Sequence, residues 1–242
     1  MKYLIKIKYD GSKFYGFQRL NEESSVQKLL EEALLKINKK EVLVKGAGRT
    51  DRGVHALGQG VSFDLDIDIT EEGLRKAINS LVEPYVYVTE CMVMDDDFHA
   101  RFDTDKKIYR YKINLGEYDP LLYDYTFEPN YKLDIDKMKE VAELFKGVHD
   151  FRNFVSGERD NYDCIIYNID FVQEEDILNI IFEGKSFYRY MVRNLVGAMI
   201  EVGRGKEPLE RVKKMLDLEE NGTLFTAPSN GLYLENVIYD EK

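Results

Sequence analysis

Apolar and polar residues alternate over several stretches of the first half of the chain. Each alternation predicts a β-strand, because successive side chains of a strand point to opposite faces of a sheet. The clearest stretch, residues 2–9, ends at Asp10 and Gly11, a turn-forming pair, whereas other apolar residues recur at helical spacing behind the capping candidates Ser24 and Ser25. The pattern predicts strands at 2–9, 61–67 and 86–93, a short apolar run at 42–44, and helices at 26–37 and 70–81.

The second half of the chain repeats this order of elements loosely. The pattern there predicts strands at 108–113, 165–171, 177–182 and 232–239, and helices at 135–145 and from Ser186 onward. Strands separated by short turns as well as by helices favour an α+β structure over a doubly wound parallel sheet. We therefore expect an α+β fold of two related α/β halves, an N-terminal half over residues 1–104 and a C-terminal half over residues 105–242.

Composition excludes several classes of protein. Two cysteines cannot form a disulfide framework, and the three histidines lie too far apart in sequence for a zinc motif. The N-terminus lacks the continuous apolar core of a signal peptide, and no apolar run reaches the length of a membrane span. We therefore expect a cytoplasmic protein with no metal and no membrane partner. The net charge of -11 argues against a protein that coats nucleic acid by charge alone.

Glycine is most concentrated in residues 45–64, which we expect to form a loop between strands. Five glycines there surround Arg49, Asp51, Arg52 and His55. Two phosphate-binding motifs fail on this segment. The dinucleotide fingerprint needs a glycine where Asp51 stands, and a P-loop needs Lys and Ser or Thr where Val54 and His55 stand.

Asp51 is the carboxylate of this loop, and Arg49 and Arg52 flank it. Nearby positive charge keeps a carboxylate ionised, and an ionised carboxylate can serve as a nucleophile or a base. A structural salt bridge in a turn explains the same local composition, so composition alone leaves both interpretations open.

Residues 187–202 are apolar on nearly every side in their second half, which predicts a largely buried helix. Arg193 lies within this run. A guanidinium rarely enters a core without a carboxylate partner, because an unpaired buried charge is costly, and Asp51 is one candidate partner. The alternative is an arginine whose charged end reaches solvent or pairs locally.

Basic and aromatic residues are interleaved over residues 98–113. A strand there places Tyr109 and Tyr111 on one face and Arg110 and Lys112 on the other. A tyrosine ring can stack on a nucleobase while neighbouring cations hold phosphates. An ordinary strand with its tyrosines packed in the core explains the same pattern.

Several motifs resemble, in the same order, those of the tRNA pseudouridine synthase A family. The most specific is AGRTDRGVHALGQ at 47–59. The others are YDGSKFYGFQR at 9–19, SVQKLLEEAL at 25–34, DDFHARFD at 96–103, YRY at 109–111, GVHDFRNF at 147–154, MVRNLVGAMIEVGRGK at 191–206 and TAPSNGLYLENVIY at 226–239. The resemblance covers essentially the whole chain.

The resemblance implies the pseudouridine synthase fold, with a mixed, mostly antiparallel sheet and a catalytic cleft between the two halves. It implies an isomerase that converts uridine to pseudouridine at positions 38, 39 and 40 in the anticodon arm of tRNA, without a cofactor. The base is detached from C1′ of its ribose, turned, and rejoined through C5. The family pattern also implies a homodimer whose partner is tRNA rather than DNA.

The same pattern assigns roles to four residues. Asp51 matches the catalytic carboxylate, which either attacks the sugar or first removes a proton from it. Tyr109 matches the ring that stacks on the target uracil, and Arg193 matches the arginine that pairs with the aspartate. Arg49 matches the arginine associated with filling the space left by the flipped base.

The chain departs from the family pattern at a few positions. Arg52 stands where the bacterial pattern more often has alanine, and Tyr188 and Arg189 replace more apolar residues.

Basic residues gather in segments 1–20, 98–116 and 184–214, which could form a positive surface on an acidic body. Two rival functions are a noncatalytic RNA-binding module and a glycoside or nucleoside hydrolase, which would also place a carboxylate near C1′.

Overall fold

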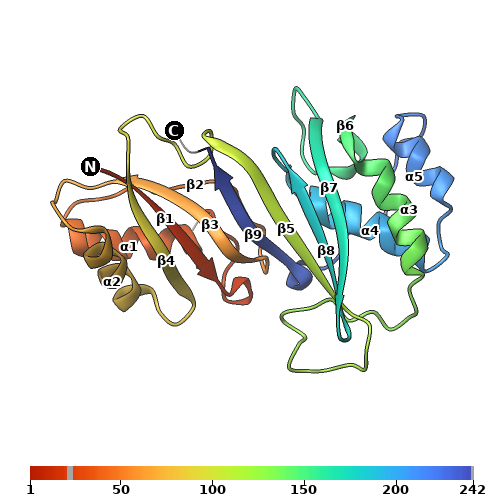
Figure 1. Cartoon of the computed structure of the whole chain (residues 1–242), viewed down its shortest axis with the longest axis horizontal. Coiled ribbons are helices and arrows are strands. Elements are labelled where there is room, and N and C mark those ends of the chain that lie inside the picture. Colours follow the sequence, from red (N-terminus) through yellow and green to blue (C-terminus); the bar gives the residue numbers. More distant parts are fainter. Residues whose placement is uncertain (21–23, 241–242) are drawn as a thin grey trace. The chain divides into compact units, whose positions relative to one another are not determined.

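The computed structural model describes residues 1–20 and 24–240 and divides into two compact units (Figure 1). Unit 1 comprises Met1–Asp105 together with the C-terminal segment from Tyr233, and unit 2 comprises Lys106–Leu232. The division expected from sequence, at residues 104 and 105, differs from this one in the last strand. That strand follows the second half in the chain but packs in unit 1.

The sheet of unit 1 is built around β1 (Lys2–Tyr9). This strand pairs antiparallel with β3 (His55–Asp64) on one side and with β4 (Val86–Met94) on the other (Figure 1). At the other edge of β3, β9 (Leu232–Tyr239) pairs in parallel and the short β2 (Lys45–Gly46) pairs antiparallel. The alternating residues of β1 are fully buried, as a period of two predicts: Tyr3, Ile5 and Ile7.

Two helices complete unit 1, and each begins at a hydroxyl cap. In α1 (Val26–Asn38) the cap is Ser25, and in α2 (Glu71–Val82) it is Thr70. Each hydroxyl accepts a backbone N–H bond from the first helical turn, at 3.3 Å in α1 and 3.2 Å in α2. The caps explain why the helices start where the apolar periodicity starts.

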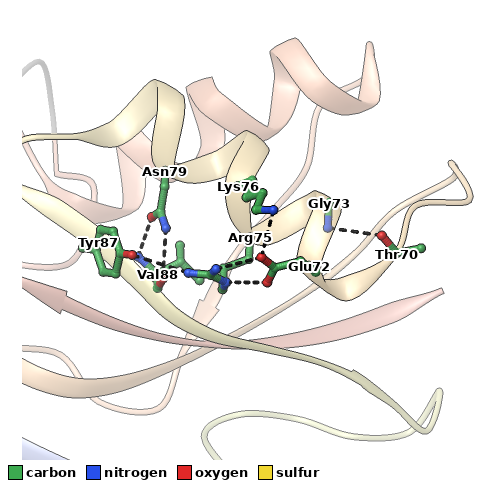
Figure 2. Close-up of polar contacts among 8 residues, drawn as sticks. All are labelled: Thr70, Glu72, Gly73, Arg75, Lys76, Asn79, Tyr87 and Val88. Atoms are coloured by element: carbon green, nitrogen blue, oxygen red, sulfur yellow. Dashed lines mark hydrogen bonds and ion pairs between the residues drawn. The ribbon is translucent and has the colours of Figure 1, made fainter.

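Helix α2 is fixed to strand β4 by the amide side chain of Asn79. Its nitrogen donates to the carbonyl of Val88 at 3.0 Å, and its oxygen accepts the Val88 N–H at 2.7 Å (Figure 2). On the exposed side of the same helix, Arg75 donates two hydrogen bonds to Glu72, both at 2.9 Å (Figure 2). The buried amide therefore sets the register between helix and strand, while the ion pair stays at the surface.

The sheet of unit 2 is antiparallel throughout its described strands. Its strands are β5 (Thr104–Asn114), β6 (Gly147–Asp150), β7 (Asp163–Glu174) and β8 (Ile177–Gly184). β8 lies between β5 and β7, and β6 pairs with the outer side of β7.

Three helices pack together in unit 2 (Figure 1): α3 (Ile135–Phe145), α4 (Met191–Gly203) and α5 (Leu209–Leu216). Helix α3 contacts both α4 and α5. Nearly all residues of α4 are buried, which confirms the buried helix expected from its apolar pattern.

Two sequence expectations are corrected by the backbone. The helix expected from Ser186 begins at Met191, because Tyr190 before it has a left-handed φ of 62°, which an α-helix cannot contain. The glycine-rich segment 45–64 is not a loop throughout. Strand β3 starts at His55, so the loop proper is residues 47–54.

The architecture confirms the expected fold class. Helices and strands mix in both units, and the pairings between the strands named above within each unit are antiparallel except that of β3 with β9. Over the described residues, no helix has the length and apolarity needed to cross a membrane.

Candidate active site

The loop 47–54, here named the Asp51 loop, joins β2 to β3 in unit 1. Its first residues are clamped by Gln59, a fully buried side chain of β3. The amide nitrogen of Gln59 donates to the carbonyl of Gly48 at 2.7 Å, and the amide oxygen accepts the Gly48 N–H at 3.3 Å. Both polar groups of a buried amide are thus used to fix the loop backbone.

The tip of the Asp51 loop is a tight turn. The carbonyl of Asp51 accepts the N–H of Val54 at 3.1 Å, and Gly53 between them has a φ of 79°, which favours glycine. Val54 is buried, Asp51 is half-buried, and Arg49 and Arg52 are exposed. The turn therefore fixes the aspartate backbone at the boundary between protein and solvent, where rigid scaffolds present reactive groups.

Thr50 anchors the loop beside the aspartate. Its buried hydroxyl is hydrogen-bonded to the hydroxyl of Tyr9 at 2.7 Å, and its carbonyl accepts the N–H of Phe17 at 3.1 Å. Burial raises the pKa of Tyr9, so this phenol stays neutral and the bond persists across the physiological pH range.

We expect Tyr9→Phe to lower the free energy of unfolding by about 2 kcal/mol, because the buried Thr50 hydroxyl loses its partner. The measurement is urea denaturation followed by circular dichroism. Tyr87→Phe is the matched control, since the Tyr87 ring is exposed and its hydroxyl only accepts a 3.4 Å bond from Arg75. Equal midpoints for the two variants would show that the Tyr9 hydroxyl does not stabilise the loop.

Two glycines let residues 9–17 approach the Asp51 loop closely. A Cβ atom on Gly11 would overlap the carbonyl of Val54 and lie 2.9 Å from the backbone nitrogen of His55. A Cβ on Gly16, whose φ is 105°, would lie 2.8 Å from the carbonyl oxygen of Thr50. The motif at 9–19 therefore acts as the backbone support of the motif at 47–59.

His55 at the start of β3 is buried and belongs to this support. Its Nδ1 accepts the backbone N–H of Gly11 at 3.0 Å, and its ring stacks on Tyr233 with 4.7 Å between centroids. The carboxylate of Asp10 lies 3.5 Å from the same Nδ1. Because an Nδ1 that accepts an N–H bond carries no proton, we assign a neutral imidazole here rather than an ion pair.

Tyr109 lies on β5 of unit 2 and is 7% exposed. Tyr111 is buried on the same face, while Arg110 and Lys112 are partly exposed on the other, so the predicted alternation is confirmed. The ring of Phe187 packs edge-on against Tyr109, with 5.1 Å between centroids and 75° between planes. The burial fits a core tyrosine, and it limits how a base could reach the ring without a shift of its neighbours.

Arg193 lies in the first turn of α4, also in unit 2, and is half-buried. Its Nε donates to the carbonyl of Ala227 at 2.7 Å, and its own carbonyl accepts the Ala227 N–H at 3.1 Å. The guanidinium lies 4.9 Å from the ring centroid of Tyr190. Burial raises the pKa of Tyr111, and the nearby positive charge of Arg193 opposes that shift.

The predicted site residues thus fall into two groups. Asp51 and Arg49 share one loop of unit 1, and Tyr109 and Arg193 lie in unit 2. The pairing of Asp51 with Arg193 stays a prediction. The sequence pattern assigned no role to the residues that support the loop. Gly11 and Gly16, which follow Tyr9 in the chain, were the available signal of this support.

Comparison with known proteins decides the family. A family model described as tRNA pseudouridine synthase matches residues 5–103 and 141–240. The chain belongs to the tRNA pseudouridine synthase family. This confirms the resemblance that the motifs indicated, and as a member of the tRNA pseudouridine synthase family the chain is an isomerase.

Full-length relatives of the tRNA pseudouridine synthase family agree. tRNA pseudouridine synthase A of Pseudothermotoga lettingae is 42% identical over 238 residues, which cover 96% of this chain and 97% of the relative. The enzyme of the same name from Listeria monocytogenes is 40% identical, covering 99% of each chain. That of Staphylococcus carnosus is 38% identical, covering 98% of this chain and 90% of the relative.

Proposed function

We propose that this isomerase converts uridine to pseudouridine in the anticodon arm of tRNA, at positions 38, 39 and 40, and that Asp51 is its catalytic residue. The observation that carries the proposal is the Asp51 loop itself. Its backbone is fixed by Gln59, Thr50 and residues 9–17, while the aspartate remains half-buried at its tip. Membership of the family and relatives that share nearly the full length of the chain support the reaction.

The reaction needs only a positioned carboxylate. The bond between N1 of uracil and C1′ of the ribose breaks, and a bond between C5 and C1′ forms. The hydrogen on C5 is lost as a proton, and N1 gains a proton in place of its bond to C1′, so neither an oxidant nor a group donor is consumed. A carboxylate can serve as a nucleophile at C1′ or as a base at the sugar. Asp51 is proposed to supply that group.

The uridine must leave the helical stack before its glycosidic bond becomes accessible. Extrusion costs a few kcal/mol, which stacking and edge contacts in the enzyme offset. We propose Tyr109 as the stacking ring, Arg49 as the exposed side chain that occupies the vacated space, and Arg193 as the partner that orients Asp51. Phe187, edge-on to Tyr109, would then border the bound base.

We expect Tyr109→Phe to keep tRNA affinity within about twofold, because stacking uses the ring face and not the hydroxyl. Fluorescence anisotropy with labelled tRNA measures this, and Tyr109→Ala should weaken binding in the same assay. A collapse of affinity in Tyr109→Phe would contradict a stacking role.

The positional proposal is tested with unmodified tRNA transcripts. Each transcript carries uridine at only one of the positions 38, 39 or 40, with cytidine at the other two. After incubation with the enzyme, carbodiimide treatment and primer extension should give a stop at the single uridine. A transcript with no uridine at these positions is the control, and a stop elsewhere in it would contradict the proposal.

The homodimer implied by the resemblance and the cytoplasmic location expected from the composition stay predictions. Sedimentation velocity of the purified chain tests the first, with a mass of twice 28.3 kDa expected for the dimer.

A further inference from the structure

The Asp51 loop carries an arginine, Arg52, whose side chain contacts a tyrosine ring. The guanidinium carbon of Arg52 lies 4.2 Å from the ring centroid of Tyr15. Arg52 is exposed, and Tyr15 keeps 46% of its surface exposed. Stacking of this kind is worth about 0.5–1 kcal/mol at a surface. The contact between Arg52 and Tyr15 therefore orients the guanidinium more than it stabilises the fold.

The contact follows from the way two backbone segments are packed. The N–H of Tyr15 donates to the carbonyl of Ser24 at 2.9 Å, which fixes the tyrosine backbone. A Cβ on Gly16 would lie 3.3 Å from the carbonyl carbon of Asp51 and 3.4 Å from the nitrogen of Arg52. The support that positions Asp51 thus also brings Tyr15 under Arg52.

Arg52 differs in its partners from Arg75 and Arg211, two arginines held by carboxylates. Arg75 is paired with Glu72 (Figure 2), and Arg211 is paired with Glu207 and Glu220. Within residues 1–20 and 24–240, the side chain of Arg52 forms its ring contact with Tyr15 and no ion pair or hydrogen bond. The guanidinium carbon lies over the ring, and the N–H donors of the group remain for a ligand.

We propose that Arg52, oriented by Tyr15, binds a phosphodiester group of the RNA next to the target uridine. A planar guanidinium presents parallel N–H donors that match two phosphate oxygens, and it stays charged at any physiological pH. Arg52 follows Asp51 directly in the chain, so a nucleotide bound at Asp51 places its flanking phosphates within reach. This inference rests on the proposed function.

The test compares Arg52→Ala with the wild type in tRNA binding and in turnover. A lost phosphate contact should reduce the slope of log affinity against log salt concentration by about 0.7–0.9. We expect KM to rise about fivefold at moderate salt while kcat changes less than about twofold. The reason is that the phosphate contact stabilises the bound substrate and the transition state equally. Arg75→Ala is the matched control, since Arg75 is bonded to Glu72, and both KM and salt slope should be unchanged.

Three further variants separate charge from orientation. Arg52→Lys should keep the salt slope but lose part of the affinity, because the positive charge remains whereas the parallel N–H donors of the guanidinium are lost. Tyr15→Phe should behave as wild type, and Tyr15→Leu should raise KM as Arg52→Ala does. Thermal denaturation of each variant verifies that it is folded.

The inference fails if the wild type forms pseudouridine but Arg52→Ala keeps the wild-type salt slope and KM. It also fails if Arg52→Ala lowers kcat alone, since the residue would then act on the chemical step. A wild type that binds tRNA and forms no pseudouridine would instead overturn the proposed function, and the salt slopes of the binding assay would still decide the role of Arg52.

Discussion

Asp51→Asn should abolish pseudouridine formation, with kcat reduced at least about a thousandfold, while tRNA affinity stays within about threefold. Asparagine keeps the size of the side chain but can act neither as a carboxylate nucleophile nor as a base. The loop backbone is held by Gln59, Thr50 and residues 9–17, so the substitution should leave the fold intact. Single-turnover assays with excess enzyme measure the rate of the chemical step directly.

The matched control for this prediction is Asp64→Asn. Asp64 ends β3, the strand that follows the Asp51 loop, is exposed, and contacts Lys2 at 3.3 Å, so its loss should change the rate less than about twofold. If Asp51→Asn retained more than a tenth of the wild-type rate, Asp51 would not be the catalytic carboxylate.

Gly11→Ala should destabilise the protein by about 3 kcal/mol and lower kcat/KM by about a hundredfold. The added methyl group would overlap the carbonyl of Val54 and crowd the nitrogen of His55, and neither backbone atom can rotate away. The N–H of Gly11 would also be displaced from Nδ1 of His55. The Asp51 loop would therefore lose its support although no loop residue is changed. Urea denaturation and single-turnover rates measure the two effects.

Gly222→Ala is the control for Gly11→Ala. A Cβ on Gly222 would meet only the end of the Arg211 side chain, at an ordinary 3.6 Å, so stability and rate should match wild type. A Gly11→Ala enzyme with wild-type stability and kcat/KM would show that close packing of residues 9–17 does not position the loop.

Local periodicity was sufficient to predict most elements. Strand β1, helix α3 and strand β9 have the bounds expected from their apolar patterns, because each buries one face against its own unit. The start of α4 could not be predicted, since it depends on the left-handed backbone of Tyr190. Helix α5 and the short strand β6 were missed, because both are short elements that tertiary packing fixes.

Some residues of the candidate site could likewise be predicted from the sequence, and others could not. Composition and motif singled out Asp51 and its glycine-rich surroundings, since rare residue combinations are visible in a sequence. The support of the loop was not visible, because it consists of backbone contacts from Gly11 and Gly16 and buried bonds from Tyr9 and Gln59. The burial of Tyr109 likewise depends on Phe187, which is remote in sequence.

The central claim is that the chain isomerises uridine in tRNA through Asp51. The most direct test is nucleoside analysis by chromatography and mass spectrometry after unmodified tRNA is incubated with the wild type and with Asp51→Asn. The wild type should convert uridine to pseudouridine one for one, with no change in RNA mass and no free uracil, and the variant should leave uridine intact. Stoichiometric release of uracil, or equal pseudouridine yields from both proteins, would contradict the claim.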